Sequence, residues 1–170
     1  MILPIVKEPN PILHRKATPV LELTPEVQDL IESMIQTMYA AQGVGLAANQ
    51  VGSSHNILVA SPEGKEGQEL VLVNPRIMEQ GGRRRLPEGC LSLPGISTEV
   101  PRSETLIASG LNREGRPTTL KAQGLLAQIL QHEVDHLNGH LFPDRLGLWR
   151  RRRLLKNYQK LYQMLGQVQF

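Results

Sequence analysis

The sequence predicts an α+β domain in which mostly antiparallel sheets surround a central helix carrying an HExxH motif, with another helix at the C-terminus. Amphipathic helical patterns lie towards both ends of the chain, and short β-prone segments with turn signals lie between them. The regular alternation of strands and helices that a parallel sheet requires does not occur. The 170 residues suit one compact domain with a core of its own.

The first predicted helix begins after Thr24, a good N-cap residue, with Pro25 at the first helical position. Gly43 is a natural end for this helix. Apolar residues recur between these points at steps of three and four and form one stripe that faces a core: Val27, Leu30, Ile31, Met34, Ile35 and Met38.

The middle of the chain has the pattern of strands and turns. Residues 56–60 and 69–73 are short and β-prone, and a turn over residues 62–65 separates them. Residues 105–111 form a third predicted strand, which ends in a turn at 112–115. Glycines and prolines interrupt residues 81–95, and we assign no strand there.

Two more helices are predicted in the second half. One spans residues 122–137 and ends at Asn138–Gly139, with an apolar face made of Leu125, Leu126, Ile129, Leu130, Val134 and Leu137. The other spans residues 148–165, with Trp149, Leu154, Leu155, Tyr158, Leu161, Tyr162 and Leu165 on one side. We therefore expect a catalytic part over residues 1–147 and a basic amphipathic helix over 148–170 that belongs to the same domain.

Composition excludes several classes of protein. Apolar residues make up 40% and charged residues 21%, which is ordinary for a globular chain and too apolar for a disordered one. No run approaches the ~20 apolar residues that cross a bilayer, so we expect no membrane partner. The N-terminus has no signal or transit peptide pattern, and we expect a cytoplasmic protein.

The charge is distributed unevenly. The net charge is only +3 and the sequence pI is about 9.2, but four consecutive arginines stand at Arg150 to Arg153. This concentration indicates an anionic partner at one end of the molecule, and we expect no DNA partner.

The HExxH motif runs from His132 to His136. Residues four apart lie on one face of a helix, so the two histidines can direct their imidazoles at a single cation. Glu133 borders that site, where it can take a proton from a metal-bound water. A solvated polar patch explains the motif less well, because Leu125 and Ile129 continue the same inward face.

A third ligand must come from upstream of the motif. Zinc proteases of the extended type place a histidine where this chain has Phe142, and no glutamate follows Glu133. His140 lies beyond the end of the helix and is better interpreted as a surface residue of a turn. Cys90, the only cysteine, is a candidate because a thiolate is a strong ligand. A buried structural thiol is the alternative.

Three motifs, in this order, resemble those of bacterial-type peptide deformylases. They are GVGLAANQ at residues 43–50, EGCLS at 88–92 and QHEVDHLNG at 131–139. The similarity extends from about Pro9 to Arg145. Asn49 occupies a variable position and Ser103 stands where many relatives have proline, and we expect neither to touch the chemistry.

The resemblance implies a metal-dependent hydrolase. Cys90, His132 and His136 would bind one divalent ion, usually iron(II), with zinc, nickel or cobalt as substitutes. Glu133 would be the general acid and base. The implied reaction removes the N-formyl group from the formylmethionine that begins newly made polypeptides, and it releases formate.

The resemblance also implies how the substrate is held. The side-chain amide of Gln50 and the backbone N–H of Leu91 would stabilise the oxyanion. Three residues would pair with the substrate backbone, namely Val44, Gly45 and Gly89. A pocket for the methionine side chain would be lined by Leu125, Ile129 and Val44.

Two other functions share part of this pattern. A zinc endopeptidase also carries HExxH, but it would need the downstream ligand that this chain lacks. An RNA-binding module could use the arginine-rich helix beside a structural metal, although such a metal usually has four protein ligands. For the C-terminal helix itself, docking to ribosomal RNA near the peptide exit and a merely solvated basic face both stay open.

Overall fold

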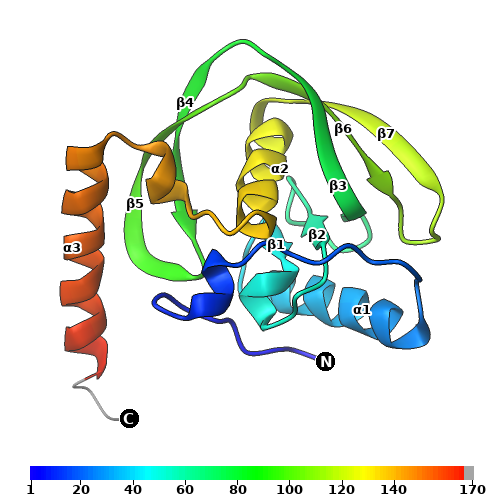
Figure 1. The fold of residues 1–170 in the computed structure, drawn as a ribbon, viewed down its shortest axis with the longest axis horizontal. Helices are drawn as coiled ribbons and strands as arrows, with labels where there is room; N and C mark the ends of the chain where they lie inside the picture. Colours follow the sequence, from blue (N-terminus) through cyan, green and yellow to red (C-terminus); the bar gives the residue numbers. More distant parts are fainter. Residues whose placement is uncertain (167–170) are drawn as a thin grey trace.

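The structure is a computed structural model that describes residues 1–166 (Figure 1). The three α-helices of this part are α1 (Pro25–Ala40), α2 (Gly124–Leu137) and α3 (Leu148–Gly166), and the 3-10 helices are η1 (Pro11–His14), η2 (Ala48–Val51) and η3 (Phe142–Arg145). The strands are β1 (Gly45–Ala47), β2 (Ile57–Ala60), β3 (Leu70–Gly81), β4 (Arg84–Cys90), β5 (Leu93–Arg102), β6 (Thr105–Leu111) and β7 (Pro117–Gln123). The predicted α+β class with antiparallel sheets is confirmed, because each pair of neighbouring strands is antiparallel.

A five-stranded sheet in the order β1-β2-β3-β6-β7 lies between α1 and α2. Successive side chains of a strand point to opposite faces, and both faces of this sheet are covered. Ile57 and Val59 of β2 therefore pack in the cluster that contains α1, while Leu58 packs in the cluster that contains α2. The packing against the sheet thus fixes the position of α2 in the interior of the molecule.

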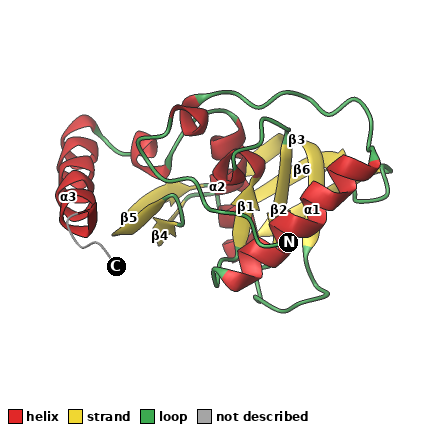
Figure 2. Ribbon diagram, turned by 90° about the horizontal axis from the view of Figure 1, so that it is seen from below, coloured by secondary structure: helices red, strands yellow, loops and turns green. Residues whose placement is uncertain are grey.

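The second sheet consists of β4 and β5, which lie on the other side of α2 from β2 (Figure 1). α3 covers this small sheet from outside, and Figure 2 shows it at one end of the molecule. Leu93 and Val100 of β5 pack with Tyr158 of α3 in a third core cluster. Tyr158 also donates from its hydroxyl to the carbonyl of Glu8, at 2.9 Å.

The α1 prediction is confirmed at its start. Thr24 accepts a hydrogen bond from the backbone N–H of Val27, and Pro25 is the first helical residue. Its end differs in detail, because the helix stops at Ala40 and Gln42 takes the left-handed φ of 55°. The backbone N–H of Gly43 then donates to the carbonyl of Met38, which is a common way to close a helix.

The sequence-based assignment missed four strands: β1, β4, β5 and β7. Glycines and prolines hide β4 and β5, yet the two strands pair along almost their whole length. The predicted start of α2 at Ala122 was two residues early, because Ala122 and Gln123 end β7. Gly124 changes the chain direction there with a φ of 60°, which only glycine adopts readily.

The predicted apolar side of α3 is only partly confirmed. Leu154, Tyr158 and Leu161 face the core, whereas Trp149 is 81% exposed and Leu165 is 60% exposed. Residues 167–170, which were assigned to the same helix, lie outside the described residues. None of the helices in residues 1–166 is long and apolar enough to cross a bilayer.

Candidate metal centre

Three side chains converge between α2 and the end of β4. The Sγ of Cys90 lies 3.2 Å from the Nε2 of His136, which lies 3.2 Å from the Nε2 of His132. The three ligand atoms all lie within 4.8 Å of one another. One thiolate and two imidazole nitrogens are a donor set for zinc, iron or a similar divalent ion, so these residues fit the implied metal.

Local structure explains this convergence. The two histidines are four residues apart on α2, one turn of the helix. Cys90 ends β4, at a register shift after Gly89 and before a two-residue turn into β5. Because β4 runs beside α2, the bend delivers the thiol to the helix surface that carries the histidines.

Glu133 is buried beside these ligands, and its Oε2 has no hydrogen-bond partner among the described residues. Burial raises its pKa to about 7 because the charged form loses its hydration. β1 passes very close to it. A Cβ added to Gly45 would stand 2.5 Å from the Oε1 of Glu133 and 2.7 Å from Ile129, so this position requires glycine.

Gln50 lies in η2, directly after β1, and its side chain is buried. Its Oε1 accepts from the backbone N–H of Ala47 at 2.9 Å, which fixes the orientation of the amide. The Nε2 then donates to Ser92 Oγ at 3.2 Å and to Cys90 Sγ at 3.6 Å. The amide N–H groups are therefore directed at the converging ligands.

Asn49 lies close behind this site, although it does not line the cavity described below. It is buried, and its Nδ2 donates to the backbone carbonyl of His136. The interaction ties η2 to the last turn of α2. Ser103 lies on the other side of α2, where its backbone N–H and carbonyl both bond the side chain of Gln131.

A row of buried charges continues from His132 away from the ligands. The Nδ1 of His132 lies 2.9 Å from Glu88 Oε2, and Arg102 donates to both oxygens of Glu88 at 2.7 and 2.9 Å. Arg102 also donates to Asp135 at 2.6 Å, and Arg145 donates to both oxygens of Asp135. A carboxylate on Nδ1 holds the proton there and leaves the Nε2 of His132 free for a metal.

These ion pairs determine the charge state of the carboxylates. Burial alone would raise the pKa of Glu88, but hydrogen bonds from Arg102 and His132 outweigh it and lower the pKa to about 2. Burial of Asp135 is likewise outweighed by Arg145 and Arg102, which hold its pKa below the ordinary value. Both groups are therefore ionised at neutral pH. Glu133, with a pKa of about 7, is instead at least half protonated at any pH below 7.

A cavity of about 400 Å³ opens onto the ligands. Ten of the eleven site residues expected from the sequence line it: Val44, Gly45, Gln50, Gly89, Cys90, Leu91, Leu125, Ile129, His132 and Glu133. His136 lies behind the cavity wall and is 1% exposed. Leu125 does not face the core as its place in the predicted apolar stripe suggested; it is 46% exposed at the cavity rim.

Sequence reasoning gave no role to Glu88, Arg102 or Asp135. A signal existed for Glu88, which lies two residues before Cys90, so both side chains leave an ordinary strand on the same face. Arg102 and Asp135 gave no local signal, because Arg102 is 14 residues from Glu88 and 33 residues from Asp135 in the sequence.

Comparisons with known proteins agree with this geometry. The family model described as polypeptide deformylase matches residues 2–152. The chain is 46% identical to a peptide deformylase of Aquifex aeolicus over 164 residues, covering 95% of this chain and 97% of that protein. It is 47% identical to one of Halothermothrix orenii over 146 residues, covering 85% and 94%.

Solved structures are similar over nearly the whole chain. A peptide deformylase from Legionella pneumophila superposes with a TM-score of 0.93 at 38% identity and covers 99% of this chain and all of that one. One from Synechococcus elongatus, solved in complex with actinonin, has a TM-score of 0.85 at 39% identity, covering 92% and 86%. With the converging cysteine and histidines and a family match over most of its length, the chain belongs to the peptide deformylase family.

Proposed function

We propose that the chain hydrolyses the formyl amide of N-formylmethionyl nascent peptides, with Glu133 as general acid and base. One water is consumed, the C–N bond of the formyl amide breaks, and formate and a free amino terminus are released. The observation that carries the assignment is the buried Glu133 beside the convergent Cys90, His132 and His136, inside a cavity, in a chain of this family.

The metal site supplies the electrophilic part of the chemistry. A divalent ion held by Cys90, His132 and His136 would be a Lewis acid that activates water and polarises the formyl oxygen. Three protein ligands leave a coordination position open, as catalytic sites require. Glu88 supports the site by orienting His132.

Glu133 would move the proton. It takes one from the attacking water and returns it to the nitrogen of the leaving amine. A pKa of about 7 suits both steps, because the carboxyl can change its protonation state near neutral pH.

The developing negative charge on the formyl oxygen would be stabilised by two donors. One is the side-chain amide of Gln50, which is already oriented by its bond to Ala47. The other is the backbone N–H of Leu91 in the turn after Cys90. Each such donor is typically worth ~3–4 kcal/mol of barrier reduction.

The cavity offers an edge and a pocket for the peptide. β1 is an edge strand of the large sheet, so an extended substrate could pair with Val44 and Gly45 on one side and Gly89 on the other. Leu125 and Ile129 would meet the methionine side chain together with Val44. These roles follow the family resemblance and the shared lining of one cavity.

Iron(II) is our proposal for the native ion, with zinc, nickel or cobalt able to replace it. The test is anaerobic purification, metal analysis and a formate-release assay with a formyl-Met peptide on one sample. Formate release should scale with iron content and decline in air, since iron and the Cys90 thiolate are both oxidisable. Casein cleavage without formate release would instead identify a zinc endopeptidase and overturn the assignment.

We further propose that the enzyme works in the cytoplasm and that α3 docks on the ribosome. Arg152, Arg153 and Lys156 are exposed on α3, and contacts with RNA phosphates release counterions. Removing the whole helix is a poor test, because Tyr158 is buried in the core and bonds Glu8. The better variant is Arg152→Gln/Arg153→Gln, with Arg116→Gln/Lys121→Gln as a control of equal charge. Only the first should lose co-sedimentation with ribosomes at low salt; equal behaviour of the two would refute docking through α3.

A further inference from the structure

A second cavity lies on the opposite side of α2 from the metal centre. Its volume is about 760 Å³, and its walls come from β3, the β3–β4 turn, the end of β5 and α2. Gln131, Val134 and Asp135 face it, whereas Ile129, His132 and Glu133 face the first cavity. The helix therefore separates two cavities, and only one of them has a part in the proposed hydrolysis.

The second cavity is strongly basic. Five cationic side chains and a single acidic one, Asp135, are among its lining residues: Lys16, Arg76, Arg83, Arg102 and Arg145. The whole chain has 19 lysines and arginines against 16 acidic residues, so its composition predicts near parity. The first cavity has the reverse balance, with Glu88 and Glu133 and neither lysine nor arginine. The cationic lining is therefore a property of this cavity rather than of the surface as a whole.

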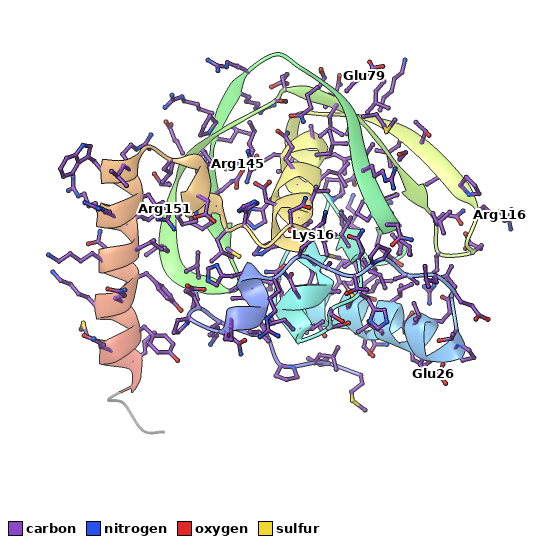
Figure 3. All side chains as sticks on the ribbon, in the orientation of Figure 1. Lys16, Glu26, Glu79, Arg116, Arg145 and Arg151 are labelled. Atoms are coloured by element: carbon purple, nitrogen blue, oxygen red, sulfur yellow. The ribbon has the colours of Figure 1, made fainter. Side chains whose placement is uncertain are left out.

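The five cationic side chains differ in whether a carboxylate already pairs with them. Arg102 is fully engaged by Glu88 and Asp135, and Arg145 shares Asp135 with it. Lys16, Arg76 and Arg83 are exposed, and within residues 1–166 none of the three forms an ion pair. Three cations are thus free to meet a ligand, and Figure 3 labels one of them, Lys16, near the lower end of α2.

The inner wall of the cavity is held in place by hydrogen bonds. Gln131 bonds both backbone groups of Ser103, and the hydroxyl of Ser103 donates to Gln80 Oε1 at 2.9 Å. This arrangement leaves the amide nitrogen of Gln80 as a further donor in the lining. A fixed wall with free donors at the rim is pre-organised for an anion, which lowers the entropic cost of binding.

We propose that this basic cavity, lined by Lys16, Arg76 and Arg83 at its rim, binds a small anion that carries two or more phosphate groups. Arginine forks match phosphate geometry, and several separate cations favour a ligand with several charges. The volume lies within the range of small-ligand sites, about 300–1,000 Å³. A concave site of this size fits a compact ligand better than a strand of nucleic acid, which needs an extended groove.

The test measures binding of inorganic pyrophosphate to the metal-loaded protein by isothermal titration calorimetry at low salt. Arg76→Gln/Arg83→Gln should weaken binding at least ~10-fold, because each lost charged contact costs about that factor. The matched control is Arg116→Gln/Lys121→Gln, which removes two exposed charges outside both cavities and should change affinity less than about twofold. Orthophosphate should bind more weakly than pyrophosphate. Formate release should be unchanged in both variants, which also shows that they are folded.

Three results would overturn the proposal. If pyrophosphate does not bind to the unaltered protein, the cavity is not a site for such an anion. Equal affinity in the unaltered protein and Arg76→Gln/Arg83→Gln would place the anion elsewhere, for example on the metal. A larger loss in Arg116→Gln/Lys121→Gln, or in Arg152→Gln/Arg153→Gln measured beside it, would place the anion outside this cavity. A nucleoside triphosphate and inorganic tripolyphosphate, titrated in parallel, distinguish the sources of the phosphate: equal affinities mean that only the phosphates are recognised, and a tighter nucleotide means that its base also contributes.

Discussion

The two helices that pack on opposite faces of the large sheet are buried by different kinds of residue. The core side chains of α1 are almost all apolar: Val27, Ile31, Met34, Ile35 and Met38, with Thr37 as the exception. The buried residues of α2 include five polar or charged ones: Gln128, Gln131, Glu133, Asp135 and His136. One sheet thus supports a helix that serves stability on one face and a helix that serves chemistry on the other.

The difference has an energetic consequence. Burying the apolar stripe of α1 contributes about 25 cal/mol per Å² of apolar surface removed from water. Burying charges on α2 costs free energy unless each charge is paired. Asp135 meets this condition through Arg102 and Arg145, whereas the Oε2 of Glu133 has no partner among the described residues and its raised pKa favours the neutral form. Four predictions separate these contributions.

The largest effect should come from Arg102→Met, which leaves the carboxylates of Glu88 and Asp135 buried without their shared partner. Breaking a buried ion network in this way typically costs ~3–5 kcal/mol. Urea unfolding should show that loss. Metal affinity should fall as well, because Glu88 would no longer be held against His132. A loss below about 1 kcal/mol would show that the network does not contribute to stability.

Met34→Ala should destabilise the protein through α1 without touching the chemistry. Met34 is 0% exposed in the α1 cluster, and such truncations cost ~2–5 kcal/mol through lost burial and a cavity. Unfolding free energy should fall, while kcat per folded, metal-loaded molecule stays near that of the unaltered protein. A large fall in kcat at full metal content would mean that the two faces of the sheet are not independent.

Glu133→Gln should lower activity and leave stability unchanged, which is the reverse of the effect of Met34→Ala. The variant should keep its metal and its stability, since an amide avoids the cost of burying a charge at this position. Its kcat should drop at least ~100-fold, because the amide cannot accept a proton. Normal turnover in the metal-loaded variant would remove Glu133 from the mechanism.

The smallest of the four effects concerns acid. The pKa of Glu88 is about 2 in the folded chain, below its ordinary value, so the stabilisation is complete well above that ordinary value and is lost as the pH falls towards 2. Between pH 7 and 3 the loss from this group is on the order of 2 kcal/mol. Arg102→Met should show a smaller acid loss over the same range, since the depressed pKa depends on Arg102. Parallel pH profiles for the two proteins would contradict this explanation.

Local patterns were enough to predict α1 and most of the metal centre. Thr24 and the apolar stripe determine a helix through contacts within a few residues, and HExxH places two histidines on one face by helical spacing alone. The third ligand needed more. The residues alone left Cys90 either a ligand or a buried structural thiol, and the resemblance decided between the two, because 46 residues separate Cys90 from His136.

What could not be predicted depends on pairing between distant segments. Glycines and prolines interrupt β4 and β5, and their register comes from their pairing with each other. The ion row through Arg102 joins three segments of the chain, and no spacing in the sequence signals it. The exposure of Leu125 and Trp149 shows the same limit, since a periodic pattern does not tell an open cavity or a free surface from a core.

The contact at Gly45 limits how the catalytic helix could be transplanted. Any side chain there would collide with Glu133 and Ile129, so α2 fits only against a strand that is bare at that point. A designer who grafts this HExxH helix onto another scaffold must therefore move a glycine-bearing strand with it. The smallest transferable unit is a strand–helix pair, and libraries that randomise one partner should keep the other fixed.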